Sequence, residues 1–122
     1  TGCWVYACCI SPDGQEVLSG GSDGVARVWG VDDAVERLVL RGHRSSVLAV
    51  SWQAGTLVTG SNDATVRLWS SIDGALERVV YTHTSPVACL ATAMNNEQLL
   101  VAVGARDGNI SVERPVGFAT LR

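Results

Sequence analysis

The stretch GHRSSVLAVSWQAGTLVTGSNDATVRLW, residues 42–69, decides the fold. It holds three short runs rich in Val, Leu and Thr, near residues 46–52, 56–60 and 65–69, and Gly, Asn, Asp and Ser fill the gaps. Branched apolar residues favour strands, and Gly and Asp favour the tight turns that join them. Another such run near residues 76–82 completes a predicted set of four strands.

The landmarks of this stretch recur along the chain. Asp23 precedes Asp63 by 40 residues, as Trp29 precedes Trp69, and Asp107 follows Asp63 by 44. A period of about 40 to 45 residues with Trp and Gly-His landmarks is typical of four-stranded propeller blades. The sequence therefore predicts an all-β chain of three four-stranded antiparallel blades, approximately at residues 1–40, 41–81 and 82–122.

Composition limits the function classes. Nine arginines and no lysine stand against twelve acidic residues, giving a net charge of -3. Binding along nucleic-acid phosphates needs an excess of cations, so we expect no nucleic-acid partner. The lack of lysine excludes P-loop, Schiff-base and Ser-Lys chemistry. No apolar run approaches the roughly 20 residues that span a bilayer, so no membrane span is predicted.

The four cysteines do not have the spacing of a zinc site. Cys3, Cys8, Cys9 and Cys89 form neither a C-x-x-C pair nor another metal-ligand pattern. We expect free, partly buried thiols in a reducing compartment, with a disulfide or a metal as the alternative. The predicted location is therefore the cytoplasm or nucleus, and no metal or cofactor site is predicted.

The repeats resemble those of the WD40-repeat, G-protein-beta-like propeller family, over essentially the whole chain. The resemblance implies a structural tetrad of His, Ser or Thr, Asp and Trp in each well-formed blade. The matching positions are His43, Thr59, Asp63 and Trp69 in the second repeat, Ser19, Asp23 and Trp29 in the first, and His83 and Asp107 in the third.

The repeats also depart from the family pattern. The first repeat has its His position at or before Thr1, and the third has Val103 and Glu113 in place of the hydroxyl residue and the Trp. We therefore expect the third blade to be the least rigid. Residues 114–122 are expected either to supply its outer strand, within residues 116–121, or to fray.

A nucleophilic triad is the alternative interpretation of His43, Asp63 and Thr59. Such a triad would not explain Trp69 or the recurrence of the set, whereas a structural network explains both. No catalytic residue is predicted, and the chain is expected not to be an enzyme. Trp52, which has no Trp counterpart in the other repeats, is expected in the core between blades.

Two sets of positions are candidates for partner contact. Trp4 and Tyr6 flank Val5, which is expected to point inward, and aromatic and Arg side chains dominate interaction hot spots. Packing between blades is the alternative role for both aromatics. In the family that the chain resembles, the matching positions face the top of the propeller: they are Trp4, Tyr6, Ser46, Leu48, Pro86 and Ala88, together with Ser22, Asn62 and Arg106 before the loop aspartates.

Three blades leave two exposed edges, and unpaired edges invite association. The chain is expected to be part of a larger propeller, for example a seven-bladed one, to assemble with itself, or to pair with another chain. The resemblance implies a scaffold that binds a protein or peptide. The alternatives are a substrate receptor of a ubiquitin ligase, although no Trp-Asp-x-Arg motif is present, and a regulatory propeller fused to a catalytic domain.

Overall fold

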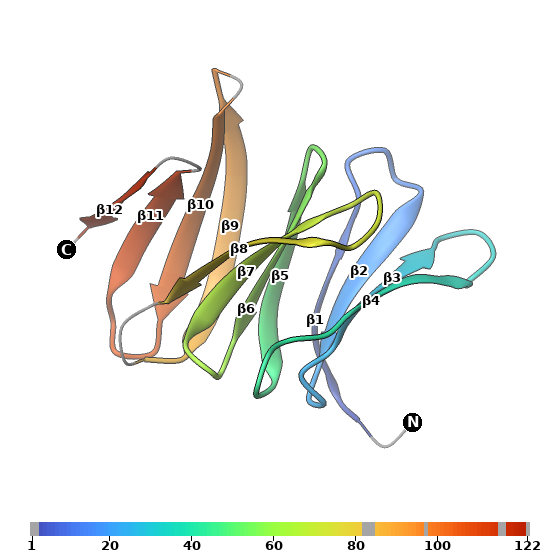
Figure 1. The fold of residues 1–122 in the computed structure, drawn as a ribbon, viewed down its shortest axis with the longest axis horizontal. Coiled ribbons are helices and arrows are strands. Elements are labelled where there is room, and N and C mark those ends of the chain that lie inside the picture. Colours follow the sequence, from blue (N-terminus) through green and yellow to red (C-terminus); the bar gives the residue numbers. More distant parts are fainter. Residues whose placement is uncertain (1–2, 82–84, 97, 115–116, 122) are drawn as a thin grey trace.

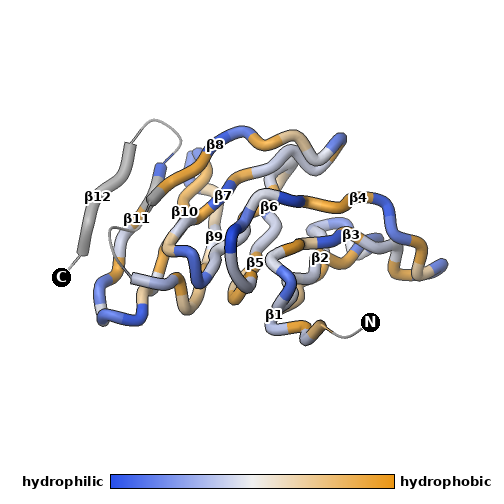
Figure 2. Tube along the Cα trace, turned by 60° about the horizontal axis from the view of Figure 1, so that its bottom comes forward, coloured by the Kyte–Doolittle hydropathy of each residue, from blue (hydrophilic) through white to orange (hydrophobic). Residues whose placement is uncertain are grey.

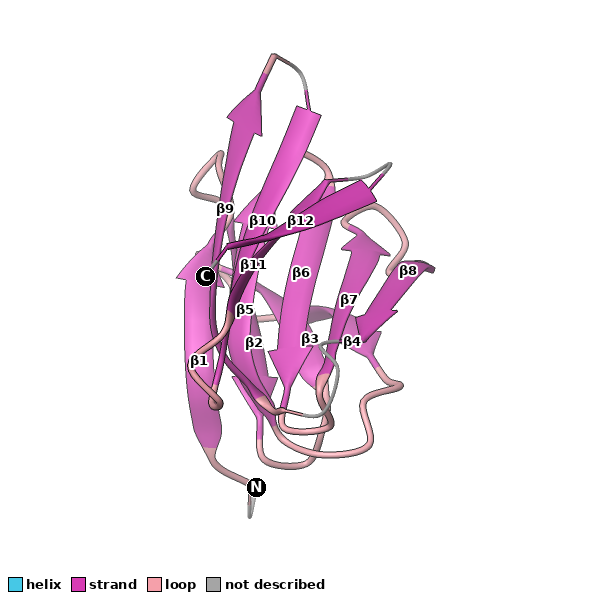
Figure 3. Ribbon diagram, turned by 90° about the vertical axis from the view of Figure 1, so that its left-hand side faces the viewer, coloured by secondary structure: helices cyan, strands magenta, loops and turns pink. Residues whose placement is uncertain are grey.

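The computed structural model describes residues 3–81, 85–96, 98–114 and 117–121. These residues form three four-stranded antiparallel sheets and, as Figure 3 shows, no helix. The predicted all-β architecture is confirmed. The strands are β1 (Val5–Ile10), β2 (Glu16–Gly21), β3 (Ala26–Gly30), β4 (Glu36–Leu40), β5 (Val47–Gln53), β6 (Thr56–Ser61), β7 (Thr65–Ser70), β8 (Leu76–Tyr81), β9 (Val87–Asn95), β10 (Gln98–Ala105), β11 (Ile110–Arg114) and β12 (Gly117–Leu121).

The three sheets stand side by side like the blades of a fan, with the chain ends at its two sides (Figure 1). Within each sheet the strands follow the order of the chain. The first strands of the blades lie next to one another, because β5 contacts both β1 and β9. The strands predicted in the second repeat match β5 to β8 within one residue. The expected outer strand of the third repeat is β12, which pairs with β11.

Aspartates fix many of the turns between these strands. In each case a side-chain Oδ1 accepts a hydrogen bond from the backbone amide two residues further on, which holds the chain in a tight bend. The described residues with this contact are Asp13, Asp23, Asp33, Asp63, Asp73 and Asp107. Aspartate therefore stabilises turns at both ends of the blades. The sequence period had marked only one of these turn positions, the one occupied by Asp23, Asp63 and Asp107.

Apolar side chains join neighbouring blades, and Figure 2 shows hydrophobic residues along strands of all three sheets. Alternate residues of a strand point to opposite faces, so each blade presents one face to each neighbour. Trp52 is buried between the first two blades, as predicted. The cluster between blades one and two contains Leu18, Ala26, Val28, Leu40, Trp52, Leu57 and Trp69, and that between blades two and three contains Val58, Val66, Leu68, Val87, Leu99, Val101 and Val103.

Two glycines let the blades approach closely. A Cβ added at Gly20 would lie 2.5 Å from Cγ1 of Val47, and one at Gly60 would lie 2.5 Å from Cγ1 of Val87. Both valines are fully buried. Each valine therefore occupies the space that the missing side chain leaves, which sets the distance between blades.

Arg37 of β4 bridges the first two blades at their outer edge. Its guanidinium pairs with the carboxylate of Glu16 and donates hydrogen bonds to the carbonyl oxygens of Ser71 at 2.8 Å and Ile72 at 3.1 Å. A planar guanidinium can serve a carboxylate and two carbonyls together because its N–H groups fan out in one plane. We call this contact the Arg37 clamp.

Removal of the Arg37 clamp is expected to have a small effect on stability. Arg37→Ala should lower the free energy of unfolding by roughly 1 kcal/mol, because the ion pair is partly solvated. Urea unfolding monitored by tryptophan fluorescence measures the change. Arg41→Ala is the matched control, since Arg41 is exposed and makes no ion pair among the described residues. Equal losses in both variants would contradict a role for the clamp.

Candidate functional site

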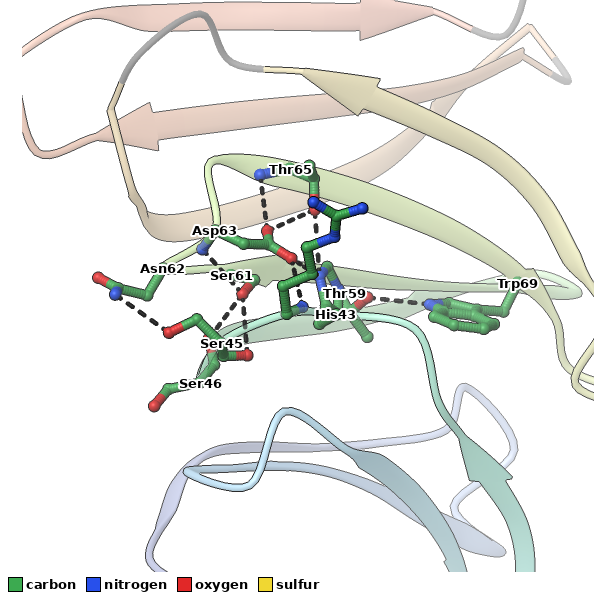
Figure 4. A network of polar contacts seen from close by, with 10 residues as sticks. His43, Ser45, Ser46, Thr59, Ser61, Asn62, Asp63, Thr65 and Trp69 are labelled. Carbon is green, nitrogen blue, oxygen red and sulfur yellow. Dashed lines mark hydrogen bonds and ion pairs between the residues drawn. The ribbon is translucent and has the colours of Figure 1, made fainter.

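His43, in the segment between β4 and β5, lies at the centre of a buried polar network (Figure 4). Its Nε2 lies 2.7 Å from Oγ1 of Thr59, and its Nδ1 lies 3.1 Å from Oδ2 of Asp63. Nε1 of Trp69 donates a hydrogen bond of 2.9 Å to the same Thr59 oxygen. These contacts join the four tetrad positions of the second repeat and link β6, β7 and the segment that enters β5.

Thr65 is a member of the network that sequence reasoning missed. Its Oγ1 donates to Oδ1 of Asp63 and lies 3.1 Å from Nδ1 of His43. The backbone amides of Thr65 and Arg44 also donate to the Asp63 carboxylate, at 3.0 and 2.8 Å. The sequence signal that could have identified Thr65 is its hydroxyl group, two residues after Asp63. The other repeats have Val25 and Asn109 at that position, so the recurrence did not reveal it.

The proton positions in this network follow from its charges. Burial alone would raise the pKa of Asp63, but hydrogen bonds from Thr65, the Arg44 amide and His43 outweigh it and lower that pKa to about 2. Burial lowers the pKa of His43 despite the nearby carboxylate, and the charge of Arg67 adds to this effect. His43 is therefore neutral, with its proton on Nδ1 facing Asp63. Its Nε2 then accepts from the Thr59 hydroxyl, which in turn accepts from Trp69.

The contacts of Thr59 favour the structural interpretation of this chain of hydrogen bonds over the nucleophilic one. Thr59 is fully buried, and its hydroxyl is used as both donor and acceptor. A buried network in which each member is satisfied fixes the relative positions of the strands that carry it. Among the described residues, no group of His, Cys, Asp and Glu is arranged to hold a metal ion.

The first repeat has only part of this network. Nε1 of Trp29 donates to Oγ of Ser19 at 3.0 Å, as Trp69 does to Thr59. Asp23 pairs instead with Arg27, at 3.0 Å. Cys3 lines a hollow of about 380 Å³ beside Ser19, Asp23 and Trp29. The imidazole of the second repeat has no counterpart among the described residues of this blade.

The third repeat keeps the turn at Asp107 but has Val103 and Glu113 in place of the hydroxyl residue and the Trp. Oδ1 of Asp107 accepts from the amide of Asn109 at 3.0 Å, and the Asp107 amide donates to Oγ of Ser85 at 3.0 Å. His83 lies outside the described residues. Val103, at the hydroxyl position, is buried in the apolar cluster with the second blade.

Six of the proposed partner-contact residues form three equivalent pairs at one edge of the blades. In each pair, the residue before the loop aspartate donates its amide to the carbonyl of the residue before the first strand. The pairs are Ser22 with Trp4 at 2.8 Å, Asn62 with Ser46 at 2.9 Å and Arg106 with Pro86 at 3.0 Å. The fold therefore brings these six positions to the same place in successive blades, and we call this place the upper edge.

The other three candidates, Tyr6, Leu48 and Ala88, lie at equivalent irregularities of the first strands. The pairing register shifts between Val5 and Ala7, between Val47 and Ala49, and next to Val87. An extra residue at such a bulge turns its side chain out of the regular ladder. The first strand of each blade thus presents one additional side chain close to the upper edge.

The exposed fractions separate these candidates. Trp4 is 73% exposed and Tyr6 is 50% exposed, and Arg106, Asn62 and Ala88 are also exposed. Ser22, Ser46, Leu48 and Pro86 are half-buried. Val5, which was expected to point inward, is 66% exposed. Val5 is the counterpart of buried Val47, but among the described residues no further blade covers its face.

The cysteines are free thiols, but two of them are not buried. Cys8 and Cys89 are exposed, whereas Cys3 and Cys9 are half-buried. The expectation of partial burial was therefore wrong for Cys8 and Cys89. Cys8 and Ile10 lie on alternate positions of β1, on the same outer face as exposed Val5.

Comparison with known proteins identifies the family. The family described as "WD domain, G-beta repeat" matches residues 1–30, 35–70 and 74–112. The chain is similar to the crystal structure of RRP9 WD40 repeats, with a TM-score of 0.83 and 24% identity, over 96% of this chain and 36% of that one. The chain belongs to the WD40 repeat family, and its three sheets are blades of the WD40 propeller type.

Two curated relatives are similar over about half of the chain. The Drosophila melanogaster protein lethal(2)denticleless is 47% identical over 60 residues, which is 46% of this chain and 8% of that protein. The ribosome biogenesis protein WDR12 homolog of Drosophila virilis is 38% identical over 76 residues, 48% of this chain and 18% of that protein. The chain thus spans a small part of the length of these relatives. No helix in the described part of the chain is long and apolar enough to cross a membrane.

Proposed function

We propose that the chain is a non-catalytic interaction module that binds a protein or peptide partner at the upper edge. The observation that carries this proposal is the placement of Trp4. Its side chain is largely exposed, while its backbone amide donates to Oγ of Ser22 and its carbonyl accepts from the Ser22 amide, both at 2.8 Å. A large aromatic group on a fixed backbone loses little conformational freedom on binding and buries a large apolar area.

Charge at the same edge supports a contact surface. The arginine side chains of Arg44 and Arg106 are exposed and make no ion pair among the described residues. The neighbouring carboxylates are occupied, because Asp63 is held by the His43 network and Asp107 by Asn109. Two arginines without an ion-pair partner among the described residues, on the same edge as the exposed aromatics of blade one but in the next two blades, favour a partner that carries both carboxylates and an apolar group.

A role in ribosome biogenesis is a second candidate. The similarity to the WDR12 homolog favours it, and such a role would place the chain in the nucleus, one of the two compartments proposed from the thiols. Cosedimentation of the tagged chain with preribosomal particles tests this candidate. Tagged chain that remains only at the top of the gradient would contradict it.

Loss of the two aromatics is expected to weaken partner binding. Trp4→Ala with Tyr6→Ala should reduce the affinity for a bound protein by at least tenfold, since hot-spot aromatics contribute about 2 kcal/mol or more each. Quantitative affinity capture, compared with the unchanged chain, measures the loss. Ile72→Ala is the matched control, because Ile72 is 83% exposed in the β7–β8 turn. Unchanged affinity with an intact fold would place the binding surface elsewhere.

A further inference from the structure

One contact recurs at both junctions between blades. In the first junction, a Cβ added at Gly20 of blade one would lie 2.5 Å from Cγ1 of Val47 and 3.1 Å from Cγ1 of Val50 in blade two. In the second junction, Val87 and Leu90 of blade three approach Gly60 in the same way. Each junction therefore joins a glycine on the face of one blade to two branched apolar side chains from the first strand of the next.

Blade three carries the glycine of this contact on its outer face. Gly104 pairs with Cys89 as Gly20 pairs with Ala7, so it holds the same place in its sheet. Because Gly20 and Gly60 each face the next blade, Gly104 faces away from blade two. The Cys89 side chain beside it is exposed, and its Sγ would lie 2.6 Å from a Cβ added at Gly104.

An apolar hollow lies on the same outer face of blade three. Its volume is about 240 Å³, and its lining residues are Ala91, Thr92, Ala93, Leu100, Ala102 and Val112. Ala102 pairs with Val112 as Leu18 pairs with Val28 in blade one. In the first junction, Leu18 and Val28 are buried in one cluster with Trp52 of blade two. The hollow therefore lies where blade one receives a large apolar side chain from its neighbour.

Blade one carries matching side chains on its own outer face, at the opposite side of the fan (Figure 1). Three residues of β1 hold the register positions at which β5 packs on blade one. They are Val5, Cys8 and Ile10, the counterparts of Val47, Val50 and Trp52. All three are exposed, Val5 by 66% and Ile10 by 64%. Contiguous exposed apolar side chains of this kind mark an interaction surface.

We propose that the outer face of blade one binds the outer face of blade three in a second copy of this chain. Val5 then lies over Gly104, and Ile10 enters the apolar hollow. The occupant is inferred from complementarity, because the two faces carry the two halves of a contact that the chain makes twice within itself. Two copies joined head to tail at both ends bring together six blades, which is within the range of closed propellers.

Charged side chains limit how much of the blade-one face takes part. Asp23, Arg27 and Glu36 line the hollow beside Trp29, and the arginine pairs with both carboxylates. Removal of these charges from water would cost free energy. The contact is therefore confined to β1 and the neighbouring part of β2, and Trp29 stays outside it.

Two cysteines give this contact a chemical marker. Cys8 holds the position of Val50, whose Cγ1 lies 3.1 Å from the Cβ position over Gly20, and Sγ of Cys89 lies 2.6 Å from the same position over Gly104. The docked Cys8 is thus placed next to Cys89, and a disulfide forms when two Cβ atoms are roughly 4 Å apart. The exposed Cys89 side chain turns to another rotamer as Val5 enters.

Disulfide formation between two single variants tests the contact. The Cys8→Ser chain keeps Cys89, and the Cys89→Ser chain keeps Cys8. The two are mixed and treated with diamide, which takes up the hydrogen atoms of both thiols as the S–S bond forms. We expect a linked dimer in the mixture, joined through a Cys8–Cys89 peptide that mass spectrometry identifies, and far slower linkage in either variant alone. Burial raises the pKa of Cys9 to about 11, which keeps that thiol unreactive.

The controls of this experiment separate the proposed contact from random oxidation of exposed thiols. Linkage of either variant with itself as fast as in the mixture would show that the thiols meet without a preferred orientation and would overturn the proposal. Absence of the Cys8–Cys89 peptide would also overturn it.

A second pair of variants tests the contact without oxidation. Analytical ultracentrifugation in reducing buffer should give the unchanged chain at twice its mass of 12.8 kDa. Ile10→Asp and Ala91→Asp change exposed side chains on the two opposite faces, so each variant should fold and sediment as a monomer. A mixture of the two should again form dimers, because each chain supplies the face that the other lacks.

Ile72→Asp is the matched control, since Ile72 is 83% exposed and lies in the β7–β8 turn, and it should leave the dimer intact. Circular dichroism establishes that each variant is folded. A monomeric unchanged chain, or dimers of Ile10→Asp as stable as those of Ile72→Asp, would overturn the proposal.

Discussion

Trp69→Ala is expected to lower the free energy of unfolding by about 4 kcal/mol, the range found for removal of a buried aromatic side chain. The indole is 3% exposed and packs with Leu18, Val28 and Leu57 between two blades. The change leaves a cavity at this junction and removes the hydrogen bond to Thr59. Urea unfolding monitored by far-ultraviolet circular dichroism measures the loss.

The matched control for this change is Trp29→Ala. Trp29 makes the same kind of hydrogen bond, to Ser19, but is half-buried and lies on the face of blade one that points away from blade two. Its replacement should cost less than half as much, because little of its packing is lost. A loss at Trp29 as large as that at Trp69 would contradict the assignment of Trp69 as the group that joins the two blades.

Asp63→Ala is expected to cost about 3 kcal/mol, because it leaves buried donors without their charged acceptor. His43, Thr65 and the Arg44 amide all lose their partner. Asp107→Ala is the control and should cost less, since the described partners of its carboxylate are both in Asn109. Equal shifts of the urea midpoint in the two variants would contradict the proposed role of the network.

The same network makes stability depend on pH. The pKa of Asp63 is lowered from 3.8 to about 2, so its stabilising effect is present above pH 3.8 and is lost as the pH falls through 2. The pKa of His43 is lowered below 6.5, so acidification below that value favours protonation of the unfolded chain. Both effects reduce stability in acid. Asp63→Ala should flatten the acid limb of a plot of urea midpoint against pH, and an unchanged limb would contradict this.

Most of the fold could be predicted from the sequence period. Landmarks such as Asp63 and Trp69 mark positions that recur once per blade, and strand composition between them placed β5 to β8 within one residue. Val5 shows the limit of this reasoning. Its counterparts Val47 and Val87 are buried because a preceding blade supplies Gly20 and Gly60, so burial at this position depends on a neighbour and not on the residue itself.

The candidate sites could be predicted only in part. The tetrad positions could be named because they recur, but Thr65 occurs in one repeat and its role appears only in the contacts. In the Arg37 clamp, the guanidinium contacts the backbone carbonyls of Ser71 and Ile72, which are 34 and 35 residues further along the chain. Because every residue has a backbone carbonyl, the pattern of side chains could not predict this contact.

The measurement that tests the central claim most directly is site-specific photocrosslinking at the upper edge. The photoreactive residue p-benzoylphenylalanine replaces Tyr6 in one chain and Ile72 in another, because both side chains are at least half exposed and Ile72 lies in a turn away from that edge. After irradiation in cells, the account predicts a discrete crosslinked protein from position 6 that Trp4→Ala abolishes, and none of that mass from position 72. The same crosslinked protein from both positions, or from 72 alone, would contradict binding at the upper edge.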